Sequence, residues 1–207
     1  MKPKLARWLG IAGLIVTALI LLFFVVYRPW ALNWGATADE IDRAMPGDEL
    51  VADPTFNATR AVTITGRPED IWPWIAQIGY SRAGFYSYDR LDNDGVPSAE
   101  QILPEYQDLT VGDTIPLSAT VGAQVLDLHR EEHLLLAVSA GSVSESPPRL
   151  WTWVWVLYEV DDRRTRLVSR LRVRASFRTT LMLDALEIMM MRKHLLGIKR
   201  RVEAHEE

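Results

Sequence analysis

Two short segments carry the residue types that most often do chemistry. The string HREEH, from His129 to His133, matches the HxxEH pattern of certain zinc enzymes. That chemistry needs both histidines on one helical face, with the glutamate beside them. Here the string straddles two strand-like runs, so Arg130–Glu132 is predicted to form a hairpin turn, and no third ligand stands nearby. We therefore predict no metal site.

The segment GFYSYDRLDNDG, residues 84–95, sets three aromatic side chains, Phe85, Tyr86 and Tyr88, beside a run of carboxylates. Its end, Asp92–Gly95, resembles the start of a calcium loop. Aligning the glycine at the sixth position, however, puts an arginine first and a glutamine last, where carboxylates are required. The calcium interpretation fails. A sugar-binding platform, a catalytic elbow and the rim of a pocket remain as interpretations.

Other candidate motifs are weaker still. The string GYSRAG, residues 79–84, has one residue too many between Ser81 and its second glycine to be a nucleophile elbow. Asn57-Ala58-Thr59 is a glycosylation sequon, which matters only in a eukaryotic secretory pathway. His194 and His205 stand among basic residues and are predicted to be solvated. The sequence therefore assigns no catalytic residue and no cofactor.

Composition bounds the class of protein. The chain has 207 residues, of which 48% are hydrophobic and 24% charged, so it can bury the core of one ordinary domain with an appendage. The net charge of −4 lacks the basic excess of nucleic-acid-binding proteins. The absence of cysteine excludes disulfides, thiolate nucleophiles and cysteine zinc sites.

The first thirty residues are predicted to be a membrane anchor. Leu9–Tyr27 contains no charged residue, and roughly 19 helical residues span about 28 Å, close to the thickness of a bilayer's hydrocarbon core. Trp8 and Trp30 stand where interfacial aromatics belong. A cleaved signal peptide normally has a shorter apolar core and a small-residue cleavage site, whereas this run ends in Tyr-Arg-Pro-Trp.

Flanking charges predict the orientation of the anchor. Three basic residues, Lys2, Lys4 and Arg7, precede the apolar run, while Arg28 is followed by an acidic segment. The positive-inside rule then places the N-terminus in the cytoplasm and the remainder outside it, in the cell membrane as a single-pass protein.

A tether, residues 31–55, and a folded domain, residues 56–207, are expected after the anchor. Thr37 and Glu40 match a capping box, which predicts a short helix ending near Met45 on a tether that lies on the domain surface. The domain is predicted to contain a strand, a helix opening at Pro68, a short helix near residues 98–103, a run of antiparallel strands and a long closing helix from about Thr179 to Glu203. This order indicates an α+β fold whose closing helix covers one face of the sheet.

The final hairpin suggests which side chains face that helix. A two- or four-residue loop pairs the strands so that one face alternates tryptophan with arginine: Trp155 opposite Arg170, Trp153 opposite Arg172 and Trp151 opposite Arg174. This tryptophan face is either a wet outer surface with isolated rings or a docking surface for a protein partner or for lipid headgroups. The opposite face is then predicted to meet the closing helix, with these residues forming the cavity walls: Val154, Val156, Leu171, Val173 from the strands and Met182, Leu186, Met189 from the helix.

Several strings resemble one family. These are WGATADEIDRAMPGDELV, ATRAVTITGRPEDIWPWIAQIG, GFYSYDRLDN, ILPEYQDLTVGD and MMMRKHLLGIKRRVE, which together cover about residues 34–203. They are similar to membrane-linked members of the SRPBCC superfamily, the START-like or polyketide-cyclase-like helix-grip domains. The resemblance implies a curved antiparallel sheet of about six to seven strands wrapped around the long C-terminal helix, with an apolar cavity between them.

Members of this superfamily bind lipids, polyketides and other hydrophobic molecules, and a minority catalyse cyclisation or hydration. The resemblance places residues 84–95 near the cavity mouth, where Tyr86, Tyr88 and Asp89 would contact a ligand or merely seal the end of the domain. The leading hypothesis is a membrane-tethered binding module for a hydrophobic small molecule or lipid. The alternatives are a cyclase- or hydrolase-type enzyme using Tyr86, Tyr88, Asp89 or His129, and a membrane-surface module that binds proteins through Trp151, Trp153 and Trp155.

Overall fold

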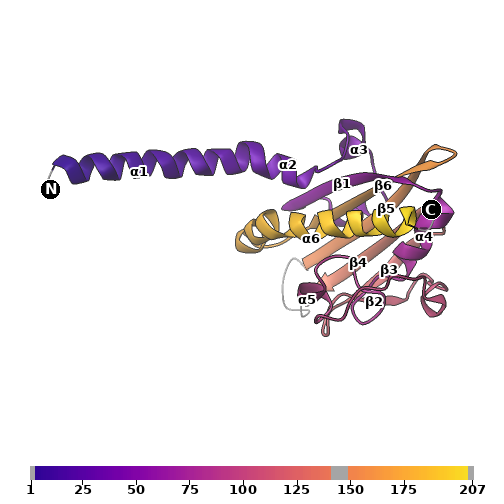
Figure 1. The fold of residues 1–207 in the computed structure, drawn as a ribbon. Helices are drawn as coiled ribbons and strands as arrows, with labels where there is room; N and C mark the ends of the chain where they lie inside the picture. Colours follow the sequence, from indigo (N-terminus) through magenta and orange to yellow (C-terminus); the bar gives the residue numbers. More distant parts are fainter. Residues whose placement is uncertain (1–2, 141–148, 205–207) are drawn as a thin grey trace.

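A long N-terminal rod projects from a sheet-and-helix domain (Figure 1). The computed structural model describes residues 3–140 and 149–204. The rod consists of helix α1 (Pro3–Leu22), a π-helical turn η1 (Phe23–Tyr27) and α2 (Arg28–Leu32). Within it, Arg7–Leu32 is long and apolar enough to cross a membrane, and its most apolar 18 residues have a mean hydropathy of 2.9. Its most apolar window is not buried against any other part of the described chain.

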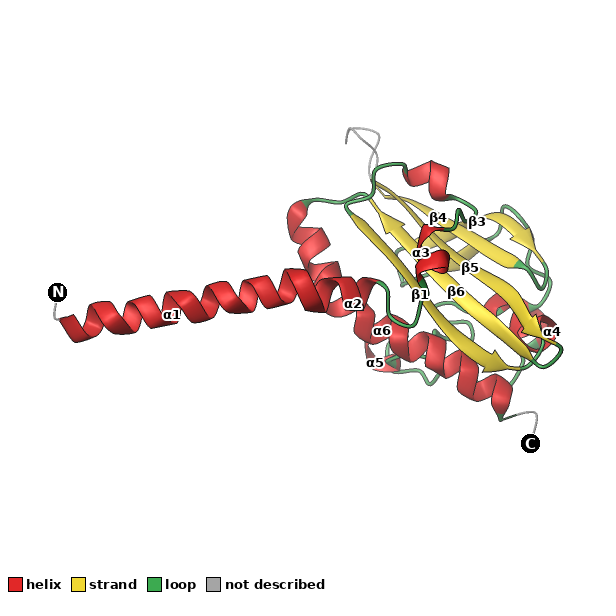
Figure 2. Cartoon of the chain, turned by 90° about the horizontal axis from the view of Figure 1, so that it is seen from above, coloured by secondary structure: helices red, strands yellow, loops and turns green. Residues whose placement is uncertain are grey.

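The domain is built on six antiparallel strands. The strands are β1 (Phe56–Thr65), β2 (Thr114–Pro116), β3 (Gly122–His129), β4 (His133–Ala140), β5 (Arg149–Asp161) and β6 (Arg164–Val173). Their order across the sheet is β1-β6-β5-β4-β3-β2. The long helix α6 (Phe177–Glu203) and the shorter α4 (Pro68–Ala76) cover one face of the sheet. Figure 2 looks onto the opposite face, with α3 (Ala38–Asp42) in front of the strands. The predicted α+β helix-grip fold is confirmed.

Capping residues explain where the main helices begin. The Ser176 hydroxyl accepts a hydrogen bond from the Thr179 amide at 3.3 Å at the start of α6. In the tether, Thr37 and Glu40 form the predicted capping box, although the helix α3 (Ala38–Asp42) ends before Met45. The prediction of a helix near residues 98–103 is wrong, because these residues form no helix. The Ser98 hydroxyl instead bonds to the Tyr86 amide and to Asp89, and the short helices lie on either side as α5 (Asp89–Asp92) and η3 (Pro104–Tyr106).

The predicted register of the last hairpin is wrong by one residue. The turn has two residues, as expected, and Asp161 pairs with Arg164, but a bulge at Val160 adds an extra residue to β5. Trp153 therefore pairs with Leu171 rather than Arg172. Because side chains alternate strictly along a strand, this one residue moves every tryptophan of β5 to the other face.

The tryptophans face the helix. Trp155 is fully buried in the main core, with Trp151 and Trp153 packed at its edge. We call this α6-covered side the inner face. Leu171 and Val173 lie on it beside Leu183 of α6, as predicted. The predicted outward facing of Trp151, Trp153 and Trp155 is therefore wrong, and they do not form a docking surface on the outside of the sheet.

The tether covers the opposite, outer face. Val154 and Val156 pack there against Met45 of the tether, so their predicted place beside α6 is wrong. Arg170, only 3% exposed, donates to the backbone oxygens of three tether residues and forms an ion pair with Asp48 at 2.6 Å. The three oxygens belong to Glu40, Ile41 and Arg43. A guanidinium carries five donors, which suits an irregular segment whose carbonyls have no strand or helix partner.

Helix α6 turns an unexpectedly polar stripe inward. Asp184 is 4% exposed and forms an ion pair with Arg28 of α2 at 2.7 Å. Glu187 pairs with Arg60 of β1 at 2.5 Å. Because these carboxylates, and not Met182, Leu186 and Met189, point toward the rest of the domain, the helix is rotated from its predicted setting. Met182, Leu186 and Met189 are 57%, 56% and 56% exposed, and their predicted contact with the sheet is wrong.

Candidate functional site

An apolar pocket lies between the inner face and α6. Its volume is about 160 Å³. It is lined by two tryptophans of β5, three residues of α6, three from loops and one from α5: Trp151, Trp153, Met190, Met191, His194, Phe85, Ser87, Leu117 and Asp92. Helix α5, which contributes Asp92, lies at the end of the domain from which the N-terminal rod departs (Figure 1). The pocket is therefore near the anchor.

The segment at residues 85–88 sends its three aromatics in three directions. Phe85 enters the pocket and stacks on Trp153 with the ring centroids 6.4 Å apart. Tyr86 is buried, and its hydroxyl accepts from the Gln77 side chain and donates to the Trp74 carbonyl, both at 3.0 Å. Tyr88 turns outward, where the Lys193 ammonium lies 4.0 Å from its ring centroid.

Close packing against α6 fixes this segment. Tyr86 has a φ of +57°, a left-handed conformation that few non-glycine residues adopt. Gly197 of α6 lies directly against it, and a Cβ on that glycine would stand 2.3 Å from the Tyr86 carbonyl oxygen. Only glycine allows the helix to approach so closely. The segment is thereby held in place between the apolar pocket and a second, polar cleft that is described below.

His194 is buried, so the prediction that it is solvated is wrong; His205 lies outside the described residues. The Nδ1 atom of His194 lies 2.6 Å from the Phe85 carbonyl oxygen, and its Nε2 accepts a hydrogen bond from the Trp155 indole at 3.0 Å. These partners fix the neutral tautomer with the proton on Nδ1. Burial lowers the pKa of His194 to about 4. Because both ring nitrogens are hydrogen-bonded, His194 connects the loop at Phe85 to Trp155 of β5 and is not available as a general base.

Asp92 supplies a carboxyl to an otherwise apolar pocket. Its two oxygens are buried, and within residues 3–140 and 149–204 neither meets a hydrogen-bond donor in good geometry. Burial, followed by the charge of Asp89, raises the pKa of Asp92 above its ordinary value. The neighbouring Ser87 hydroxyl donates to the Met190 carbonyl at 3.1 Å. Asp92 is thus a polar group for which a ligand donor would supply the missing partner.

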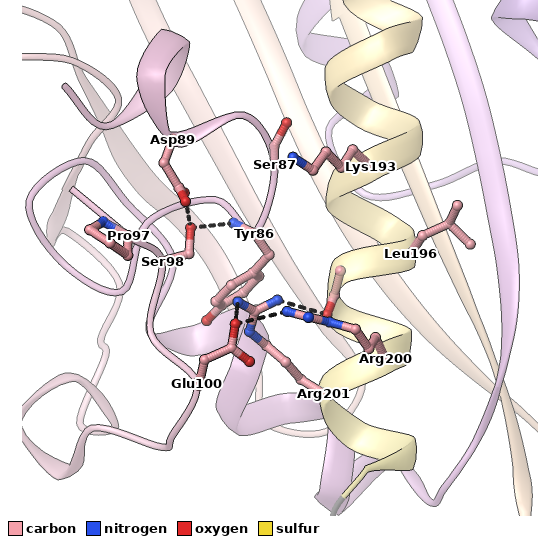
Figure 3. A pocket seen from close by; sticks show the side chains of 11 residues that line it. Tyr86, Ser87, Asp89, Pro97, Ser98, Glu100, Lys193, Leu196, Arg200 and Arg201 are labelled. Atoms are coloured by element: carbon pink, nitrogen blue, oxygen red, sulfur yellow. Dashed lines mark hydrogen bonds and ion pairs between the residues drawn. The ribbon is translucent and has the colours of Figure 1, made fainter. Parts of the chain in front are cut away.

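A polar cleft lies on the other side of the Tyr86 segment. Figure 3 shows Asp89 and the Tyr86 amide converging on Ser98, and Glu100 reaching two arginines of α6. The Glu100 carboxylate lies 2.8 Å from Arg200 and 2.7 Å from Arg201. Burial raises the pKa of the Tyr86 phenol well above its ordinary value, so the phenol stays protonated. The cleft is bounded by groups that already partner one another.

The residues predicted for catalysis do not converge. Tyr86 and Asp89 line the polar cleft, and Tyr88 lines a separate groove beside the anchor. His129 stands in the β3–β4 hairpin, where its ring packs 5.1 Å from that of His133. His133 in turn contacts Asp127 at 2.9 Å. The part of the chain that the structure describes holds no group of three His, Asp or Glu side chains that could hold a metal ion.

Sequence reasoning missed most of the pocket. The alternating tryptophans of β5 and the string of methionines in α6 are visible in the sequence, but the tryptophans were predicted on the wrong face of the sheet. Of the predicted cavity residues, Leu171 and Val173 lie on the inner face without lining the pocket, and Tyr86, Tyr88 and Asp89 line the neighbouring cleft and groove. The usable signal for Met190 and Met191 was their flexibility as apolar fillers.

Comparisons with known proteins identify the fold. No family model matches the chain, and no curated protein matches it in sequence. A solution structure of a protein from Thermobifida fusca superposes with a TM-score of 0.51 at 13% identity, covering 73% of this chain and 95% of that one. This likeness shows the helix-grip fold and nothing finer.

Two further solved structures match less closely. A Thalictrum norcoclaurine synthase variant bound to a transition-state analogue has a TM-score of 0.45 at 11% identity, covering 73% of this chain and 96% of that one. CalU16 from Micromonospora echinospora has a TM-score of 0.42 at 14% identity, covering 72% and 84%. At these scores neither likeness bears on what this chain binds.

Proposed function

We propose that this protein is a membrane-tethered binding module that takes the apolar part of a hydrophobic small molecule or lipid into the pocket beside Trp151 and Trp153. The observation that carries the proposal is the pocket itself, because its walls are aromatic and thioether side chains with one carboxyl, Asp92, among them. Pockets of this composition, mostly apolar with few polar groups, are typical of small-molecule sites.

The size of the pocket limits the ligand. A dry cavity of roughly 150 Å³ holds one benzene-sized molecule, so a volume of about 160 Å³ accepts a single ring or a short branched acyl segment. A larger ligand would keep the rest of its body outside the mouth. A hydroxyl or amine at the buried end would satisfy Asp92, whose carboxyl has no donor in good geometry among the described residues.

The tethering half of the proposal rests on the N-terminal helix. Its length and hydropathy suit a bilayer span, and basic residues stand before the apolar run. We propose that residues 1–30 cross the cell membrane with the N-terminus in the cytoplasm, and that residues 31–207 form the extracytoplasmic part. The tether, residues 31–55, then belongs to the folded unit, because its carbonyls and carboxylates complete the outer face of the sheet.

A pocket-filling variant tests the binding function. Leu117→Trp would occupy the pocket, whereas Val111→Trp, at a site 60% exposed and away from the lining, is the matched control. Full-length chains in detergent are stripped, reloaded from a total lipid extract and analysed by native mass spectrometry. We expect a bound apolar species on the native chain and on Val111→Trp, and its loss on Leu117→Trp. Equal loading of all three chains would refute a ligand site in this pocket.

A further inference from the structure

The outward side of α6 is an apolar stripe with basic ends. Residues spaced three or four apart share one side of a helix, and here that side carries Arg178, Met182, Leu186, Met189, Lys193 and Leu196 in order. The four apolar members are between 38% and 57% exposed, and the neighbouring Phe177 is 76% exposed. Both carboxylates in this part of the helix, Asp184 and Glu187, point inward to arginines, so this side carries only positive charge.

The anchor leaves the domain beside the middle of this helix. The Tyr27 hydroxyl donates to the Ala185 carbonyl at 3.3 Å, and Arg28 holds Asp184. Figures 1 and 2 show α6 running in the same general sense as α1, with its N-terminal end toward α1 and the sheet on its far side. Seven residues before Asp184 extend the helix by about 10 Å toward the side on which the apolar run of the anchor lies.

A groove lies beside the second half of this apolar stripe, where the end of the anchor meets α6. It is lined by Tyr27, Trp30, Tyr88, Met189, Arg192 and Lys193, among others, and its volume is about 510 Å³. Aromatic rings and two cations at the end of a membrane span match the polarity of the headgroup layer, where tryptophan and tyrosine settle and phosphates attract basic side chains. From Met182 to Lys193 the outward side of α6 thus changes from apolar to cationic in the same direction as a bilayer does from acyl chains to phosphates, and Arg178 is the cation at its apolar end.

We infer that the outward side of α6 docks on the bilayer that the anchor enters, with Phe177, Met182 and Leu186 in the interfacial layer and Arg192 and Lys193 at the phosphates. The inference rests on the membrane anchoring proposed above and is independent of the ligand pocket. An interfacial helix buries its apolar side by roughly 5–10 Å, which agrees with the extent of α6 beyond Arg28. The docked domain would hold the pocket mouth at the lipid surface.

Single-cysteine labelling tests this arrangement, because the native chain has no cysteine. Full-length Phe177→Cys, Met182→Cys, Val16→Cys and Leu91→Cys chains are labelled with an environment-sensitive fluorophore and placed in nanodiscs of phosphatidylcholine with phosphatidylglycerol. Val16 in α1 reports on the anchor, and Leu91, 74% exposed in α5, is the surface control. Quenching by lipids with a doxyl group near the headgroup is compared with quenching by aqueous iodide.

We expect the labels at positions 177 and 182 to be quenched several-fold more by doxyl lipid, and several-fold less by iodide, than the label at position 91. The label at position 16 should be shielded from iodide as well. Shielding at 16 with free access at 177 and 182 would overturn the docking while leaving the anchor intact. Free access at position 16 would overturn the anchor and the docking together.

Discussion

The two faces of the sheet are closed in different ways. On the outer face, arginines of β6 bind the carbonyls and carboxylates of the tether. Arg170 alone makes four such contacts and also donates to the Thr59 hydroxyl of β1; its tether partners are Glu40, Ile41, Arg43 and Asp48. On the inner face, tryptophans of β5 meet methionines of α6 and leave a pocket of about 160 Å³. The hydrogen bonds between the arginines and the tether occupy the outer face, so a ligand could bind there only by displacing the tether. The apolar walls on the inner face can contact a ligand of suitable shape without breaking such bonds. The inner face is therefore the side on which binding can occur.

The largest effect should come from breaking the outer face. Arg170→Met removes a buried charge, leaves three carbonyls and a hydroxyl without this donor, and leaves the Asp48 carboxylate with only Arg172 and the Met45 amide as partners. It should lower the free energy of unfolding by about 4 kcal/mol. Denaturant titration of the full chain in detergent measures this. Arg164→Met, whose ion pair with Asp161 is exposed on both sides, is the control and should change little. Similar effects of the two variants would mean that the tether is not held by Arg170.

A second effect concerns the inner face and depends on pH. Burial lowers the pKa of His194 to about 4 from 6.5, so the native chain binds fewer protons than the unfolded chain between these values. The stability that neutral His194 contributes is therefore complete above pH 6.5 and is lost as the pH falls toward 4. The loss should approach about 3 kcal/mol.

His194→Gln provides the comparison for this prediction, because it cannot be charged in that range. The difference in unfolding free energy between the native chain and the variant should shrink as the pH falls from 6.5 to 4. A difference that is constant with pH would show that His194 does not titrate in this way, and that the inner face near it is wetter than described.

The smallest effect should be a gain. Because burial raises the pKa of Asp92, its contribution to stability is greatest below pH 3.8 and is lost as the pH rises through its native pKa. Asp92→Asn removes a charge that the pocket disfavours and should raise the thermal midpoint slightly at pH 7, with no gain at pH 3. Loss of stability at pH 7 would indicate that the carboxylate has a native partner.

The sequence predicted the elements better than their facing. The capping box at Thr37, the proline that opens α4 and the apolar N-terminal run are local signals, and each led to the right element. The bulge at Val160 is a single residue with no local signature, yet it turns the side chains of β5 to the opposite face relative to those of β6. The rotation of α6 about its axis could not be predicted from the sequence for a different reason. Asp184 and Glu187 are buried only because Arg28 and Arg60 reach them from distant parts of the chain.

Methionine methyl groups report on both faces at once. The chain has six methionines, and Met190 and Met191 line the pocket while Met45 lies under the tether on the outer face. Full-length chain with ¹³C-methyl methionine in nanodiscs is titrated with toluene as a ring-sized apolar probe. The account predicts saturable shifts of the Met190 and Met191 resonances with the Met45 resonance unchanged. Unmoved Met190 and Met191 resonances, or an equal shift at Met45, would contradict the claim that the inner face holds the ligand.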